Sequence, residues 1–236
     1  MGAFTYSPPI VGRFPGIRGG VVHAVGLGNG PSPQELARHY GEEQKRVIGD
    51  IGDTPLSEIP SLAAWRRAFT VFGVKPTQYR NAAESLLRRL TKQGDIPSIN
   101  LLVDMANLVS IRHRVPVAVF DQREVTGSTV VRFASGEERF TDLGSGSETG
   151  PDPGEVIFVD DDDLVSARRW CWRQSAQSAA GPTTTEAVMT IEGQHEGADE
   201  TIAAAVSDLM SLLSTHQPQA RFTHGEVGPA SPTFGF

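Results

Sequence analysis

The chain has 236 residues, of which 39% are hydrophobic and 21% charged, as is ordinary for a globular protein large enough to bury a core. Its formal net charge of −7 argues against indiscriminate nucleic-acid binding over the whole surface. One cysteine, Cys171, excludes an internal disulfide. No run approaches the roughly 18 apolar residues of a membrane span, and the first residues lack the pattern of a secretory signal. We therefore expect a soluble, cytoplasmic protein.

Basic residues are concentrated in one part of the chain. Between Ser61 and Arg114 there are nine lysines and arginines but only three acidic residues. Acidic residues collect later, above all at residues 160–163. This asymmetry fits a face that attracts a phosphate backbone, and it fits an uneven but ordinary solvated surface equally well.

The first half of the chain is predicted to be mostly helical. Its hydrophobic periodicity predicts one strand and then four helices, at residues 19–27, 32–47, 61–72, 77–92 and from about residue 97 onward. Ser32 and Glu35 have the spacing of a capping box for the first helix. Pro97 is a favourable first-turn residue for the fourth helix. The apolar stripe predicted for this fourth helix consists of Ile99, Leu102, Val103, Ala106 and Val109.

Beyond Arg114 the pattern changes from helix to strand. Runs of β-branched residues predict strands at residues 115–120, 128–134, 155–160 and 184–192. A last helix is predicted over residues 200–214, and residues 144–154 are expected to form a mobile loop. The whole is therefore an α+β domain with a compact β core. Residues 1–11 are expected to be a flexible segment and residues 216–236 a disordered tail.

The helix expected near Pro97 carries the most informative polar residues. Asn100, Asp104 and Asn107 fall at i, i+4 and i+7 and would share one helix face. Two amides and a carboxylate on a mostly buried helix need hydrogen-bond partners. Those partners are either backbone groups of adjoining loops or the hydroxyls and amines of a ligand, and the sequence leaves both interpretations open.

Other kinds of site have little support. None of the six histidines has a metal-ligand spacing with Cys171 or with another histidine, so we predict no metal and no cofactor. Ser110 lacks the Gly-x-Ser-x-Gly turn of a serine hydrolase. Cys171 lies between two tryptophans and is interpreted as a core residue rather than a nucleophile. Residues 168–174 (RRWCWRQ) either stack and pair with a nucleic acid, or pack inward while their arginines pair with residues 160–163.

Residues 98–121 (SINLLVDMANLVSIRHRVPVAVFD) resemble the tRNA-editing domain of the phenylalanyl-tRNA synthetase β subunit. The family pattern is matched at Gly94, Ile99, Asn100, Val103, Asp104, Asn107, Pro116, Phe120 and Asp121. Residues 130–144 (VVRFASGEERFTDLG) resemble a further segment of that family. Motifs of its free-standing members occur at residues 65–66, 76–80, 86–89, 107–110 and 168–173. The resemblance covers about residues 12–215, which we take as one editing-like domain.

The resemblance implies a layered β/β/α domain that hydrolyses the ester of a mischarged aminoacyl-tRNA. Such an ester is already activated, so holding it beside a water and stabilising the developing oxyanion would suffice. On this reading Asn107 and Asn100 position the aminoacyl group or the water, and Asp104 holds the helix or the α-amine. The expected substrate-binding residues are Ala118, Val117, Ala106 and Glu192. The expected RNA-binding residues are Arg80, Arg88, Arg89 and Arg173.

Two positions depart from the family pattern. The synthetase usually has a histidine where this chain has Ala118, and a threonine where it has Ala106. The resemblance therefore leaves open whether the amino acid removed is tyrosine, a threonine-like residue or a non-protein amino acid. It also leaves open a non-catalytic tRNA- or RNA-binding module with the same fold, and an enzyme that hydrolyses a free small ester or amide.

Overall fold

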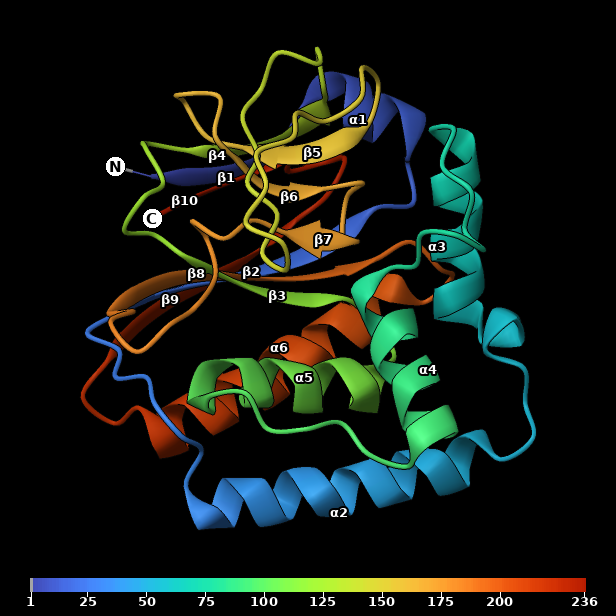
Figure 1. Ribbon diagram of the computed structural model, residues 1–236, viewed down its shortest axis with the longest axis vertical. Helices are drawn as coiled ribbons and strands as arrows, with labels where there is room; N and C mark the ends of the chain where they lie inside the picture. The colour runs from blue at the N-terminus through green and yellow to red at the C-terminus, as the bar shows by residue number, and fades with distance from the viewer. Residues whose placement is uncertain (1) are drawn as a thin grey trace.

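Two β-sheets lie face to face in the computed structural model, which describes residues 2–236 (Figure 1). The six-stranded sheet has the order β10 (Thr233–Gly235), β1 (Ala3–Tyr6), β4 (Thr129–Phe133), β5 (Val156–Val159), β6 (Val165–Arg168) and β7 (Arg173–Gln174). The four-stranded sheet has the order β3 (Val117–Asp121), β8 (Glu186–Gly193), β2 (Arg18–Val25) and β9 (Arg221–Val227). Strand β3 therefore lies at an edge of its sheet.

Helices cover the outer face of the four-stranded sheet (Figure 1). The helices are α1 (Pro8–Arg13), α2 (Gln34–Ile51), α3 (Pro60–Val71), α4 (Ala82–Gln93), α5 (Leu101–His113) and α6 (Ala198–His216), with a short 3₁₀ turn at Leu56–Glu58. Helices α5 and α6 pack on the four-stranded sheet, α2 packs on α5, and α3 and α4 stand at one side. Helix α1 instead lies beside β4 of the six-stranded sheet. The expected α+β fold with β/β/α layers is confirmed. No helix among residues 2–236 is long and apolar enough to cross a membrane.

Alternation along the strands gives each face of the four-stranded sheet its own core. Val119, Met189 and Ile191 face the helices. Phe120 and Val188 face the six-stranded sheet, where they join the aromatic side chains of the second core. Because both faces are covered, only the edge of the sheet remains open to a ligand.

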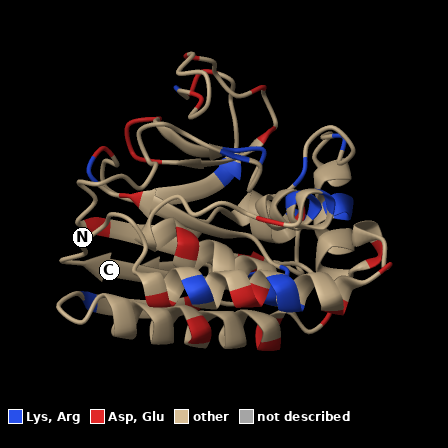
Figure 2. Ribbon diagram, turned by 60° about the horizontal axis from the view of Figure 1, so that its bottom comes forward, with Lys and Arg blue, Asp and Glu red and all other residues tan. Residues whose placement is uncertain are grey.

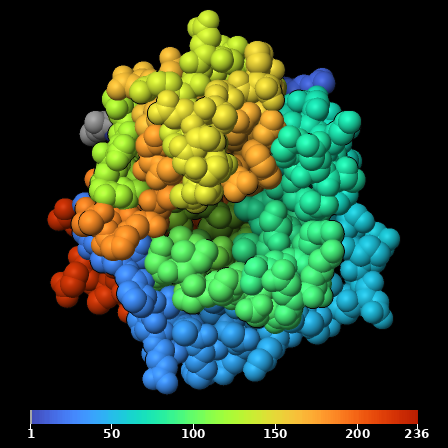
Figure 3. Space-filling model, viewed as in Figure 1, coloured from blue at the N-terminus to red at the C-terminus, as the bar shows by residue number. Residues whose placement is uncertain are grey.

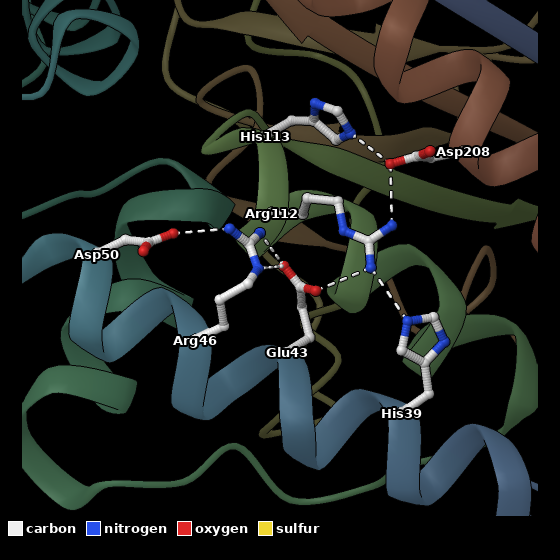
Figure 4. A network of polar contacts seen from close by, with 7 residues as sticks. All are labelled: His39, Glu43, Arg46, Asp50, Arg112, His113 and Asp208. Carbon is white, nitrogen blue, oxygen red and sulfur yellow. Dashed lines mark hydrogen bonds and ion pairs between the residues drawn. The ribbon is translucent and has the colours of Figure 1, made fainter.

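A polar network joins helices α2, α5 and α6 (Figure 4). The guanidinium of Arg112 donates to Glu43 at 2.8 Å, to Asp208 at 3.0 Å and to His39 Nε2 at 3.2 Å. His113 also bonds Asp208, at 2.8 Å. These contacts tie α5 to both α2 and α6, so the helix that borders the candidate site is held from behind.

Three helix N-termini differ from the sequence expectation, and in α4 and α5 a side-chain cap sets where the helix begins. Helix α4 begins at Ala82 and not near residue 77, since Asn81 accepts a hydrogen bond from Glu84 N–H at 2.9 Å. Helix α5 begins at Leu101, with Asn100 as its N-cap. The proposed capping box of α2 is wrong, because Ser32 makes no cap bond. Ile99, expected to face inward, is 64% exposed.

Both ends of the chain form strands, contrary to the flexible segment and disordered tail expected at residues 1–11 and 216–236. Strand β1 pairs with β4 and β10, and β9 pairs with β2 along seven residues of each strand. Most side chains of β9 are exposed and only Val227 is buried. Backbone hydrogen bonds therefore hold this strand in place, and composition gives little sign of them.

Candidate functional site

A cavity of about 500 Å³ lies where the free edge of β3 meets α4, α5 and residues 170–174. Its opening is the hollow near the centre of Figure 3, between the green atoms of the α5 region and the yellow and orange atoms above them. Apolar side chains supply most of the wall, among them Val103, Ala106 and Phe158. A few polar groups converge on it, namely Asn107, Gln174, Thr190 and Glu192. This composition is typical of a small-molecule site.

Asn107 lines the cavity from the second turn of α5 and is 9% exposed. Behind it lies the Tyr40 hydroxyl of α2. Burial and the Asp104 carboxylate raise the pKa of Tyr40, and contact with the Asn107 amide opposes that rise. Tyr40 is therefore a neutral phenol at physiological pH, and Asn107 lies between it and the cavity.

Asn100 and Asp104 do not line the cavity, because Asn100 precedes the helix as its N-cap and the Asp104 carboxylate bonds the chain segments beside the helix N-terminus. Asn100 accepts a hydrogen bond from Val103 N–H at 3.0 Å and donates to the Ala180 carbonyl at 3.1 Å. Asp104 is fully buried and accepts from the Ser32 hydroxyl at 2.5 Å, the Ile99 N–H at 2.8 Å and the Ser98 hydroxyl. Of the polar stripe only Asn107 meets the cavity.

Glu192 of β8 provides the acidic group of the cavity and is 2% exposed. Its Oε1 accepts from the Tyr6 hydroxyl at 2.7 Å and from Trp170 Nε1 at 2.9 Å. Among residues 2–236 its Oε2 accepts no hydrogen bond. Burial raises the pKa of Glu192 to about 7, and the two donors partly oppose this rise. Its charge therefore changes near neutral pH.

A left-handed turn directs Trp170 onto Glu192. Arg169 and Trp170 have φ values of 45° and 61°, which residues with a side chain seldom adopt in succession. Arg169 is held by Glu155 at 2.8 Å and lies over the rings of Tyr79 and Trp172. Trp170 is thereby buried. Sequence reasoning gave no sign of this turn.

The RRWCWRQ segment follows neither of its two expected arrangements completely. Arg168 and Arg169 pair with Glu155, so the expected pairing with residues 160–163 is wrong for them. Trp172 and Cys171 line the cavity, which places the thiol beside a candidate site. Burial, and then the nearby Glu192 carboxylate, raise the pKa of Cys171, and this disfavours a nucleophilic thiolate.

The four arginines expected to bind RNA do not form one cluster. Arg89 and Arg173 line the cavity, and Arg173 lies over the Trp172 ring. Arg88 faces a separate depression beside Arg66 and Lys92. Arg80 donates to the Thr77 carbonyl at 2.7 Å and pairs with Glu84 at 3.6 Å. Figure 2 shows basic positions gathered at the side of the molecule formed by α3 and α4.

The small residues that depart from the family pattern also line the cavity. Ala118 lies opposite Thr190 in the β3–β8 ladder, and Glu192 follows two residues later on the same face. This register places Glu192 beside Ala118, which the sequence alone did not settle. Val117 and Ala106 complete this part of the wall. Residues 2–236 hold no group of three His, Cys, Asp or Glu side chains arranged to bind a metal ion.

The fold and the cavity together define an α+β domain with a preformed, mostly apolar pocket and a few convergent polar groups. Residues 64–207 match the B3/4 domain, a domain found in the phenylalanyl-tRNA synthetase β subunit, and the chain belongs to this family.

Two known proteins illustrate the relation. The chain is 32% identical over 88 residues to the phenylalanine–tRNA ligase β subunit of Shewanella oneidensis, a match that covers 37% of this chain and 11% of that protein. A crystal structure of an N-terminal fragment of the phenylalanyl-tRNA synthetase β subunit from Pyrococcus horikoshii aligns at 10% identity with a TM-score of 0.47. That alignment covers 95% of this chain and 54% of the fragment.

Proposed function

We propose that this protein is a trans-acting deacylase, which hydrolyses the ester between a tRNA and a wrongly attached amino acid. The observation that carries the proposal is the cavity itself, which Asn107, Glu192, Arg89 and Arg173 all line in a member of the B3/4 family. A cavity of about 500 Å³ has room for an amino-acid side chain.

The reaction needs one water and no cofactor. The water oxygen attacks the ester carbonyl carbon, and the carbonyl oxygen becomes an oxyanion. When this intermediate collapses, the ribose oxygen leaves and takes a proton that originates from the water, with the neighbouring ribose hydroxyl assisting the transfer. The products are the free amino acid and the tRNA with its terminal hydroxyl restored.

Asn107 is assigned to positioning the reacting group. Its amide carries both donors and an acceptor, so it can donate to the carbonyl oxygen or orient the water. It lies on α5, which the Arg112 network holds to α2 and α6. The Asn107 amide is therefore held in place before the substrate binds. Asn100 and Asp104 support this assignment indirectly, by holding the N-terminus of the same helix.

Glu192 is assigned to selecting the amino acid. Its free Oε2 accepts a hydrogen bond from a side-chain hydroxyl, whereas an amino acid without the hydroxyl leaves Oε2 without a partner in a dry cavity. A site built in this way discriminates by as much as about 10⁴–10⁵, far beyond what a methylene difference gives. The small Ala118, Val117 and Ala106 leave room for the side chain that bears the hydroxyl.

Arg89 and Arg173 are assigned to phosphates of the acceptor end, because they stand at the cavity. Their ion-pair partners, Asp95 at 3.8 Å and Asp142 at 3.2 Å, are more exposed than the Glu84 that holds Arg80. Arg88, on another part of α4, is assigned to phosphates farther along the tRNA. Arg80 is already engaged by Glu84 and the Thr77 carbonyl, which favours a role in holding the N-terminus of α4.

The test is a panel of tRNAs charged with matched amino acids, with and without a hydroxyl: tyrosine against phenylalanine, and threonine against valine. We expect catalytic amounts of the protein to hydrolyse at least one hydroxylated ester much faster than its matched partner. Spontaneous rates for every ester, together with tight tRNA binding, would instead establish the non-catalytic binding module. Hydrolysis of free amino-acid esters at the same rate would point to a small-ester hydrolase.

A further inference from the structure

The cavity runs along the backbone edge of β3. Five consecutive residues, 116–120, line it, although alternate side chains of a strand point to opposite faces. This pattern arises when a cavity borders the backbone of an edge strand. Within the four-stranded sheet β3 pairs only with β8. Its other edge is covered near its C-terminal end, where Phe120 bridges to Ala179 and Asp121 N–H donates to the Ser178 carbonyl at 2.9 Å, and it is open near Val117.

The ladder shows which backbone groups of β3 point into the cavity. Glu192 N–H donates to the Pro116 carbonyl at 3.1 Å, which makes this pair a hydrogen-bonded one. Hydrogen-bonded pairs alternate with non-hydrogen-bonded pairs in an antiparallel ladder, so Ala118 and Phe120 also bond β8. The N–H and carbonyl groups of Val117 and Val119 therefore point away from β8.

One of these two residues is already partly engaged. Gln174 Nε2 donates to the Val119 carbonyl at 2.7 Å. The Val117 N–H and carbonyl have no hydrogen-bond partner within residues 2–236, and Val117 is 8% exposed. A buried backbone donor and acceptor on one residue, both unpaired and both beside a cavity, need an explanation, because such groups are usually satisfied.

We infer that the Val117 backbone is the clamp for the α-aminoacyl group of the substrate. An amino-acid ester carries an ammonium donor and a carbonyl acceptor on adjacent atoms, which complement the carbonyl and N–H of one extended residue. The Val117 carbonyl accepts from the α-ammonium, and the Val117 N–H donates to the ester oxygen that becomes the oxyanion. This inference rests on the proposed deacylase function and assigns the part of the substrate that every amino acid shares.

This assignment gives the backbone and the side chains of the cavity different functions. Backbone groups hold the common α-aminoacyl part, and side chains such as Glu192 read the part that varies. A backbone donor fixed in a sheet needs no reorganisation during the reaction, which is the condition for strong oxyanion stabilisation. The same residue explains why a protein with Ala118 in place of the family histidine can still hold an ester.

The decisive experiment replaces the Val117 N–H by an ester oxygen, by incorporating 2-hydroxyisovaleric acid at position 117. Removing one oxyanion donor is expected to lower the deacylation kcat by about 10²–10³-fold, with tRNA affinity unchanged. The same replacement at Val119 is the matched control. Each replacement weakens one ladder carbonyl, that of Pro116 or Ala118, so the two variants are equally perturbed in the sheet. The Val119 variant is expected to lose less kcat than the Val117 variant, because Gln174 already holds the Val119 carbonyl. An equal or larger loss in the Val119 variant would overturn the assignment to Val117.

A binding measurement tests the other half of the clamp. The probe is 3′-amino-3′-deoxyadenosine acylated through a stable amide with the preferred amino acid, compared with its desamino analogue. Loss of a hydrogen bond from the ammonium is expected to weaken binding by about tenfold or more.

The outcomes distinguish the two proposals. A wild-type protein that hydrolyses no ester would overturn the deacylase function. Wild-type deacylation with an equally fast Val117 variant would overturn the clamp alone. In a wild type without activity, equal binding of the two probes would also overturn the clamp.

Discussion

At the scale of single residues, Glu192 links the cavity to pH. Its folded pKa is about 7, against an ordinary value of 4.5. The folded chain therefore keeps this proton to a higher pH than the unfolded chain does, and the protein loses stability as pH rises from about 4.5 through about 7. The protein sustains this cost at a position that faces the cavity, as is common for residues that act on a ligand.

The Glu192 contribution is measurable by substitution. A difference of this size amounts to about 3 kcal/mol of unfolding free energy lost between the two pKa values. Urea unfolding at a series of pH values should show that Glu192→Gln removes this loss. Glu138 is the matched control, because its pKa is lowered to about 2 by bonds from the Ser135 backbone and Arg132 against the effect of burial. Glu138→Gln should remove a gain in stability over its own, lower pH range, and identical profiles would contradict the account.

At the scale of elements, the N-terminus of α5 depends on one buried carboxylate. Asp104 accepts hydrogen bonds from Ser32, Ser98 and Ile99. Its negative charge also interacts favourably with the positive, N-terminal end of the helix dipole. Asp104 is thus a positioning residue for the helix that presents Asn107.

Asp104→Ala would remove a fully buried carboxylate that accepts three charge-assisted hydrogen bonds, from Ser32, Ser98 and Ile99. We expect a loss of about 3 kcal/mol or more in unfolding free energy, and faster amide hydrogen exchange in the first turn of α5. The kcat per folded molecule should change little. A variant that retains full stability but loses deacylation would show that Asp104 acts on the substrate after all.

The sequence predicted elements better than their ends. Apolar periodicity located helices α2 to α6 and the main strands, because each buries a face with a regular repeat, but it gave no sign of α1. It misplaced the starts of α4 and α5, where Asn81 and Asn100 decide the boundary through single hydrogen bonds. The polar stripe failed for the same reason, since it assumed a helix that already included Asn100.

Other parts of the site were beyond any pattern in the sequence. The Val117 backbone groups lack a partner because β3 is an edge strand of its sheet, and strand order is a property of the whole fold. Glu192 was named from the family resemblance with its register unsettled, and pairing with β3 fixes it next to Ala118. The turn at Arg169 and Trp170 requires backbone angles that their residue types do not suggest.

At the scale of the whole molecule, the C-terminal segment completes both sheets. Strand β9 closes the four-stranded sheet, and β10 pairs with β1 at the edge of the six-stranded sheet. Gln217 joins the segment to the body by accepting from Gly28 N–H at 2.9 Å and donating to the Gly28 carbonyl at 2.6 Å.

Deletion of residues 217–236 should therefore destabilise the protein strongly, since strands β9 and β10 and their backbone hydrogen bonds are lost. We expect Tm to fall by roughly 10 °C or more, which corresponds to several kcal/mol in a protein of this size. Thermal unfolding followed by circular dichroism measures the change. An unaltered Tm would mean that these strands contribute nothing to stability, as the expected disordered tail would.

Because the molecule is acidic overall, the proposed function requires tRNA to approach one basic side. Arg89→Ala combined with Arg173→Ala should weaken tRNA binding and make it less dependent on salt, by about one to two in the log–log slope. Arg13→Ala with Arg221→Ala is the matched control, with the same change of charge on exposed residues away from the cavity. Equal effects in the two pairs would indicate a general charge effect rather than contacts at the cavity.

The central claim is that an ester is hydrolysed inside this cavity with the help of Asn107, and single-turnover deacylation tests it most directly. The substrate is the tRNA ester that the wild-type protein hydrolyses fastest, and Asn107→Ala is compared with Asn100→Ala. We expect the Asn107 variant to lose about 10²–10³-fold in rate with unchanged tRNA affinity, and the Asn100 variant to lose about 1 kcal/mol of stability with an unchanged rate. Equal rates for the Asn107 variant and the wild type would contradict the account.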